Sequence, residues 1–457
     1  MGNKVQANGI KVKKSELLVG TVVFLMMLIA FTVPLRSLLY GGYSRLALIL
    51  LFVFAVSFVA YITYGSRKLN APQILWMIVF LITLRNNANL ASGSTASTLY
   101  CIIAFFVPSF ICKMKFEEKM LEFIMWFSMV HAIIGLFLMV FPGLLINNVD
   151  RLFPNLIFSQ RSFLLATISR GYLVGLTAHY STSGMYMAAG FIVSFSFSFY
   201  QAMKKNTGIV KMNREFWLTV FFWVCLILTG KRAHLLFGTL VFCANYVLVY
   251  NRGSFKTRSQ RTFIFILMFS LLLVIVINVP AFQGTFSRFM SGEITEELYI
   301  GRVNSKWVPA MQMFKESPLF GKGWLQFGRL HPTYNSGDEI YRNVHNIYIQ
   351  LLCETGIVGT VVIVGLMVYT ISITIRRILV INKTRATNPE LLFLIFSFAY
   401  QMFFLLYGLT GNPLYDIQTL FPYMLCCGIA YKYCTKKGIR RTNQLLERNV
   451  KRQKTSV

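Results

Sequence analysis

The stretch that decides the fold is a polar segment that runs directly into a long apolar one. It reads Tyr341-Arg342-Asn343-Val344-His345-Asn346-Ile347-Tyr348-Ile349-Gln350-Leu351-Leu352-Cys353-Glu354-Thr355-Gly356-Ile357-Val358-Gly359, and a mainly apolar run continues to Ile375. The pattern predicts a helix that starts at a water–membrane boundary with His345 above it. Asn346, Gln350 and Glu354 recur one turn apart along that helix. Polar side chains in that setting are costly to desolvate, so we expect them to have a function.

The residues before this stretch predict a short amphipathic helix and a turn. Between Tyr299 and Phe314, apolar side chains recur at helical spacing on one side. Pro309 interrupts that pattern, so the helix is either kinked there or begins later. The sequence Ser317-Pro-Leu-Phe-Gly321-Lys-Gly323 then predicts a turn, because Pro and Gly break helices.

Composition indicates an integral membrane protein. The chain has 457 residues, of which 56% are apolar and 13% charged. Its apolar runs of about 17–25 residues suit a hydrocarbon core of roughly 30 Å. We therefore predict an all-α membrane protein with about twelve transmembrane helices and one large extracytoplasmic loop that contains short helices. The predicted spans are residues 17–35, 44–64, 72–84, 95–112, 120–142, 182–203, 215–230, 233–250, 262–281, 346–375, 391–410 and 415–434.

Charge sets the expected topology. The net charge of +29 lies mostly in short loops between spans and in the C-terminal tail, which favours lipid-facing anchors over nucleic-acid binding. Both termini are then cytoplasmic. Residues 1–281 hold nine spans and an interfacial segment at 143–181. Residues 282–345 form the large extracytoplasmic loop, residues 346–434 hold three spans, and residues 435–457 form a basic cytoplasmic tail.

Few outward residues are suited to chemistry. Arg232, in a tight outer turn, is either a headgroup anchor or an anion ligand. His345 is either hydrogen-bonded to backbone or part of a site, and Arg302 alone would be an ordinary solvated charge. The sequence has no phosphate-binding loop, no outward Asp-x-Asp pair and no Cys/His spacing typical of zinc. We therefore expect no cofactor and no metal, and we exclude an ATP-driven pump subunit.

The combined motifs resemble a known family. They are Thr229-Gly-Lys-Arg232, Gly301-Arg302 with Trp307, Pro318-Leu-Phe-Gly321-Lys-Gly323, and His345-Asn346 followed by Glu354-x-Gly356-x-x-Gly359. Over roughly residues 160–375 the chain resembles the O-antigen ligase and O-antigen polymerase family. The resemblance implies a C-type glycosyltransferase of the bacterial cytoplasmic membrane that uses a polyprenyl-diphosphate-linked glycan without a metal. It further implies catalytic roles for His345, Arg232 and Arg302, and substrate binding by Arg170, Lys231, Arg342, Asn346 and Glu354.

The chain departs from the family pattern at Lys231, where the family usually has Ser before the Arg. We predict a polymerase that joins undecaprenyl-diphosphate-linked repeat units into a capsule, exopolysaccharide or O-antigen chain. The alternatives are a ligase that transfers the finished glycan to another acceptor, and a flippase or transporter. Expected partners are the lipid-linked oligosaccharide and membrane lipids, together with flippase and chain-length regulator proteins, and no nucleic acid.

Overall fold

The described residues are helical, with turns between the helices and no strand among them. The computed structural model describes residues 14–64, 92–112, 117–154, 156, 158–204, 214–250, 299–334, 343–384 and 388–434. The predicted spans 72–84 and 262–281 lie outside these residues, as does Arg342. The predicted fold class, an α-helical membrane protein, is confirmed.

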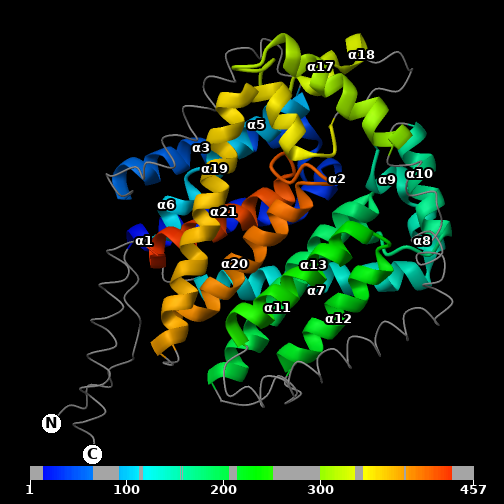
Figure 1. The fold of residues 1–457 in the computed structure, drawn as a ribbon. Helices are drawn as coiled ribbons and strands as arrows, with labels where there is room; N and C mark the ends of the chain where they lie inside the picture. The colour runs from blue at the N-terminus through cyan, green and yellow to red at the C-terminus, as the bar shows by residue number, and fades with distance from the viewer. Residues whose placement is uncertain are drawn as a thin grey trace, which may run out of the picture.

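The helices up to residue 250 form the N-terminal part of the bundle (Figure 1). They are α1 (Lys14–Thr32), η1 (Val33–Leu35), α2 (Arg36–Tyr40), α3 (Tyr43–Tyr64), α5 (Ser92–Ala104), α6 (Val107–Ile111), α7 (Glu117–Val140), α8 (Pro142–Ile146), α9 (Val149–Leu152), α10 (Phe158–Ser169), η2 (Gly175–Thr177), α11 (Tyr180–Lys204), α12 (Arg214–Leu228), α13 (Arg232–Asn245) and η3 (Tyr246–Tyr250). The predicted interfacial segment 143–181 contains the short helices α8 to α10.

The remaining helices are three short ones, from the segment predicted to be extramembrane, and three long ones. They are η4 (Tyr299–Trp307), α17 (Val308–Glu316), α18 (Phe327–Tyr334), α19 (Ile347–Thr384), α20 (Glu390–Tyr407) and α21 (Ile417–Cys434). The amphipathic helix predicted over 299–314 is a π-helix, η4, followed by α17. Pro309 lies in the first turn of α17, so the α-helix begins later than the apolar pattern.

Within the described residues, six helices are long and apolar enough to cross a membrane, so the predicted count of twelve is not confirmed. They are Leu17–Tyr40, Tyr43–Thr63, Glu117–Val140, Arg232–Val249, Ile347–Asn382 and Glu390–Tyr407. The predicted span 95–112 consists of two short helices, α5 and α6. The predicted spans 182–203, 215–230 and 415–434 are helical as α11, α12 and α21 but fall short in length or apolar composition. The count of twelve stays a prediction.

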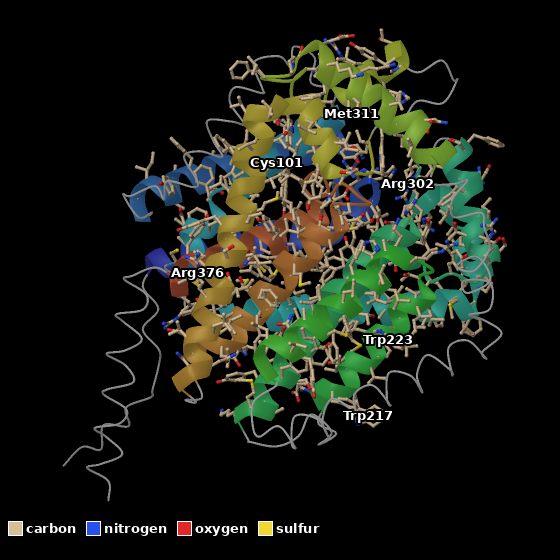
Figure 2. All side chains as sticks on the ribbon, viewed as in Figure 1. Cys101, Trp217, Trp223, Arg302, Met311 and Arg376 are labelled. Carbon is tan, nitrogen blue, oxygen red and sulfur yellow. The ribbon has the colours of Figure 1, made fainter. Side chains whose placement is uncertain are left out.

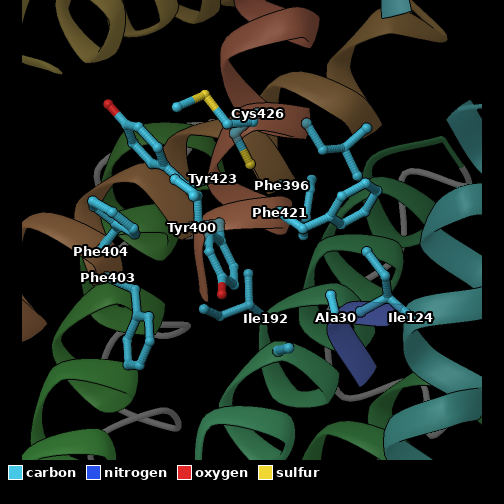
Figure 3. Close-up of a cluster of buried hydrophobic side chains, with 14 of the residues drawn as sticks. Ala30, Ile124, Ile192, Phe396, Tyr400, Phe403, Phe404, Phe421, Tyr423 and Cys426 are labelled. Atoms are coloured by element: carbon cyan, nitrogen blue, oxygen red, sulfur yellow. The ribbon is translucent and has the colours of Figure 1, made fainter. Parts of the chain in front are cut away.

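The core of the bundle lies between α11, α20 and α21. α11 packs against α7, α12, α13 and α20, and α21 packs against α6, α19 and α20. Figure 3 shows this core, with Ile192 from α11, Tyr400 from α20 and Phe421 from α21 close together. Their side chains are buried. Tight packing of this kind makes α11, α20 and α21 a rigid support for the loops at their ends.

The long helix α19 is broken where the sequence has Gly356. This residue has φ 65° and ψ −173°, a conformation that is essentially limited to glycine. The backbone groups released by the break are paired with the turn that precedes α18. Ile357 N–H donates to Pro318 O over 2.8 Å, and Gly323 N–H donates to Glu354 O over 2.8 Å. Non-helical backbone in a spanning helix is tolerated when protein covers it in this way.

A small apolar cluster fixes α17 and α18 on the start of α19. It contains the buried Ala310, Met313, Phe327, Val344 and Cys353. In Figure 1, α17 and α18 accordingly lie at the same end of the molecule as the start of α19. The segment that carries Arg302 is thus anchored to the helix that follows His345.

Surface labelling tests which side of the membrane this end occupies. Lys315 is exposed at the end of α17 and Arg376 is exposed far along α19. In intact cells, we expect Lys315→Cys to react with a membrane-impermeant thiol reagent and Arg376→Cys to react only after lysis. The parent chain, whose cysteines are buried or partly buried, is the control. The reverse labelling pattern would overturn the predicted topology.

Candidate functional site

His345 is held in an unusual backbone conformation at the start of α19. Its φ is 59°, in the left-handed region that non-glycine residues rarely occupy. Its N–H donates to Asn412 Oδ1 over 2.8 Å, and Ile347 N–H donates to Gly408 O over 2.8 Å. The loop between α20 and α21 therefore fixes the backbone of His345. Strained backbone of this type is often associated with functional sites.

Buried polar side chains support this loop from below. Asn412 Nδ2 donates to Gln350 Oε1, and Gln350 Nε2 donates to Glu354 Oε1 over 3.2 Å. The buried Glu354 also accepts hydrogen bonds from Leu325 N, Phe327 N and Tyr415 Oη, over 3.0, 3.2 and 2.7 Å. Such a satisfied network rigidifies the surrounding backbone. It joins α19, the turn before α18 and the α20–α21 loop.

Two residues predicted to bind substrate make structural contacts. Glu354 uses both oxygens for the hydrogen bonds above. Asn346 Oδ1 accepts Tyr348 N–H and Ile349 N–H over 3.0 and 3.2 Å, which is the geometry of an N-cap. These contacts point to positioning roles, and substrate binding by either residue stays a prediction.

Two cations reach the site from the π-helix η4. Arg302 is half-buried and Lys306 is 9% exposed. Because a π-helix has i→i+5 bonds, residues four apart lie nearly one turn apart on one side. The carbonyl of Ser305, between them, is hydrogen-bonded to His331 Nε2 over 2.7 Å, which ties η4 to α18. Figure 2 shows Arg302 toward one end of the molecule and Trp217 toward the other.

A third cation, Lys231, comes from the turn between α12 and α13. Gly230, with φ 67°, lies under the ring of Tyr172, where a Cβ would be 3.1 Å from the ring carbons. Leu173 N–H donates to Leu228 O over 2.8 Å, so the segment after α10 closes over this turn. Lys231 Nζ lies 5.6 Å from the ring centre of Tyr180 at the start of α11.

The charges of these three cations all lower the pKa of His345. The His345 side chain has accessible surface, but surrounding protein excludes much of the water that would solvate a charge. This burial, with the charges of Lys306, Lys231 and Arg302 and the neighbouring ring of His179, lowers the pKa of His345 to about 3. His179 is exposed in part of its surface, and the protein packed around its ring together with the charge of Lys231 also lowers its pKa, to about 4. The site therefore combines three cations with neutral imidazoles at neutral pH.

The structure brings together some of the predicted residues and not others. His345, Arg302 and Lys231 interact electrostatically. Arg232 is the half-buried first residue of α13, and Arg170 is exposed after α10, two residues before Tyr172. Neither of them has an ion pair or side-chain hydrogen bond to another residue of the described ranges. Arg342 lies outside those ranges.

Sequence reasoning gave no role to Lys306, His179 or Asn412. Asn412 lies in the short polar loop Gly408–Asp416 between two apolar helices. Polar residues in so short a loop were the available signal, but nothing in the sequence connects Asn412 with His345, about seventy residues earlier. Within the described ranges, no group of three or more His, Cys, Asp or Glu side chains is placed to hold a metal ion.

A family model matches the region that supplies the cations. Residues 217–364 match the family model described as O-Antigen ligase (Wzy_C). This match supports the O-antigen ligase/polymerase family for the chain. The matched region includes Lys231, Arg232, Arg302 and His345, whereas Arg170 and the α20–α21 loop lie outside it. A search of curated proteins finds no match to the chain. This family supports an activity of the ligase or polymerase type on lipid-linked glycans in a membrane.

Proposed function

We propose that this protein is a polymerase of the O-antigen ligase/polymerase family that joins polyprenyl-diphosphate-linked oligosaccharide units. The reaction would take place on the outer face of the bacterial cytoplasmic membrane. The observation that carries the proposal is the convergence of Lys231, Arg302 and Lys306 on His345. A diphosphate is the anion that such a cluster suits, since charge-assisted hydrogen bonds to phosphate oxygens are about twice as strong as neutral ones.

The proposed reaction is a substitution at the anomeric carbon of the donor glycan. A hydroxyl oxygen of the acceptor glycan bonds to the anomeric carbon of the donor glycan. The bond from that carbon to the diphosphate oxygen breaks, and its electron pair leaves with the polyprenyl diphosphate. The hydroxyl proton passes to a base. Cations fixed around the leaving oxygens stabilise the charge that develops there, which is commonly the largest single contribution to catalysis.

Each residue has a role in this proposal. Arg302 offers a planar fork to two phosphate oxygens, and Lys231 and Lys306 contribute point charges. His345 orients the acceptor hydroxyl, since its imidazole is neutral and can accept a hydrogen bond. Arg232 and Arg170 are proposed as further ligands nearer the rim. Of the two cations of the α12–α13 turn, Lys231 is the one whose charge acts on His345.

Purified protein in nanodiscs tests the proposal. The donor would be lipid-diphosphate repeat units extracted from source cells that lack this chain. We expect a ladder of glycan products without any added acceptor, and we expect it to persist in excess EDTA, because three side-chain cations replace a metal. Products that require a different acceptor would indicate a ligase. Movement of the donor with no new glycosidic bond would indicate a transporter, and rescue by Mg²⁺ or Mn²⁺ after chelation would contradict a metal-free site.

A further inference from the structure

We propose that the stacked rings of Phe163, His179 and Tyr180 form a platform that binds a sugar ring of the donor glycan, next to its diphosphate at Lys231. This inference rests on the function proposed above and adds a glycan subsite to it. The three rings belong to α10 and to the residues that start α11. They lie outside residues 217–364, which the family model matches.

The three rings lie against one another at distances typical of offset stacking. The ring centroid of His179 is 5.3 Å from that of Phe163 and 4.8 Å from that of Tyr180, with 18° between the planes in both pairs. The centroids of Phe163 and Tyr180 are 5.8 Å apart. Phe163 is 44% exposed and His179 is also exposed, whereas Tyr180 is half-buried. The platform therefore presents open aromatic surface.

The ring of His179 is fixed in one orientation and one tautomer. Ser181 N–H donates to His179 Nδ1 over 3.0 Å, so Nδ1 carries no proton and the neutral ring is protonated on Nε2. Nε2 has no hydrogen-bond partner within the described ranges. Ala178, directly before it, has φ 56°, in the left-handed region that residues with a Cβ rarely occupy. Such strain persists only where the surrounding structure enforces it, and here it holds a free N–H donor within the platform.

Lys231 joins the platform to the proposed diphosphate subsite. Its Nζ lies 5.6 Å from the ring centre of Tyr180, within the range of a cation–π contact. The ring of Tyr172, whose centroid is 6.0 Å from that of Tyr180, lies over Gly230, the residue before Lys231. The platform and the α12–α13 turn therefore form one packed unit. A sugar bonded to a diphosphate at Lys231 is held beside the platform by that bond.

A sugar ring is the ligand that this surface suits. The C–H groups on one face of a sugar ring pack on the electron-rich face of an aromatic ring, while its hydroxyls need hydrogen-bond partners. The platform supplies the aromatic face and, from His179 Nε2, a donor to a sugar oxygen. An isoprenoid chain would use the rings but not the donor, and a lipid headgroup would use the cation but not the rings. Aromatic side chains with a few fixed polar groups are typical of ligand sites.

Binding of two lipids to the full chain in nanodiscs tests the platform. The probes are undecaprenyl diphosphate, which has no glycan, and undecaprenyl-diphosphate-linked repeat units. We expect Phe163→Ala to weaken binding of the glycan-bearing lipid about tenfold and to leave binding of the glycan-free lipid unchanged. Phe163→Tyr should restore the affinity, and Phe163→Leu, which is apolar but has no ring, should not. Excess undecaprenyl diphosphate should displace the glycan-bearing lipid, since both place a diphosphate at Lys231.

Two further variants separate the hydrogen-bond donor and the general effect of an exposed ring. In His179→Asn the side-chain oxygen can still accept Ser181 N–H, because Asn is a good N-cap, but the outward N–H of Nε2 is lost. We expect it to bind the glycan-bearing lipid about fivefold more weakly, with unchanged thermal stability. Phe158 is the matched control, since it is 85% exposed on the same helix with no ring contact to another described residue. Phe158→Ala should bind both lipids as the parent chain does.

The outcomes that would overturn the platform are equally specific. Unchanged affinity in Phe163→Ala, or an equal loss for both lipids, would remove the glycan from these rings. Full affinity in Phe163→Leu, or a loss of the same size in Phe158→Ala, would assign Phe163 to a contact with the bilayer. A glycan-bearing lipid that undecaprenyl diphosphate cannot displace would also contradict the proposal. If both lipids bind as expected but the parent chain transfers no glycan, the polymerase function is refuted and the platform is retained.

Discussion

Gly356→Ala and Gly321→Ala are each expected to destroy the junction that supports the site. A Cβ on Gly356 would lie 2.3 Å from Leu319 C and O, and a Cβ on Gly321 would lie 2.3 Å from Glu354 C. Both glycines have positive φ, 65° and 69°. The contacts are with backbone on both sides, so no side chain can move aside. Strain of about 1–3 kcal/mol per residue adds to the lost hydrogen bonds.

Gly365→Ala in the same helix is the matched control. No atom lies within 4 Å of the position that its Cβ would take, so alanine should be tolerated there. For either junction variant we expect lower thermal stability in detergent, loss of glycan transfer, and faster hydrogen exchange at residues 319–323 and 356–358. The double variant should cost little more than the worse single one, because both break one contact. Normal exchange and activity in both single variants would show that the junction is not required.

Gly321 and Gly356 show which parts of the fold the sequence could predict and which it could not. Helix-breaking Pro and Gly predicted the turn at 317–323, and hydropathy predicted the long helix after His345. Neither pattern predicted the break at Gly356, because periodicity reports which face is apolar and not the φ of one residue. The pairing of that break with a turn over thirty residues earlier is a tertiary contact that no local signal contains.

The site was only partly predictable for a similar reason. Motifs identified Arg302 and His345, and the structure brings them together with Lys231. The family resemblance also implied substrate binding by Asn346 and Glu354, whose side chains cap α19 and anchor the turn before α18; that binding stays a prediction. A polar residue at a membrane boundary has the same sequence signature in either role. Asn412 could not be placed, because two helices of the bundle separate it from His345 along the chain.

Arg302→Ala is expected to reduce glycan transfer by about 10²–10³-fold, the usual cost of removing one fixed donor to a developing anion. Arg302 is the guanidinium that the structure connects both with His345 and with Tyr407. Arg302→Lys should recover only part of the rate, with a loss of more than about tenfold, because an ammonium cannot bind two phosphate oxygens in the plane of a fork. The kinetic measurement is kcat and KM for the lipid-diphosphate donor.

Arg329→Lys is the control for a general effect of charge or packing, since Arg329 is exposed on α18, the helix that His331 ties to η4. Its transfer rate should match the parent chain. The split between kcat and KM then identifies the step. If Arg302 binds the diphosphate equally in the ground state and the transition state, KM rises and kcat is unchanged. We expect kcat and kcat/KM to fall together, because charge grows on the leaving oxygen as the glycosidic bond breaks. Full activity in Arg302→Ala would reduce Arg302 to a solvated charge and leave Lys231 and Lys306 as the cations to test.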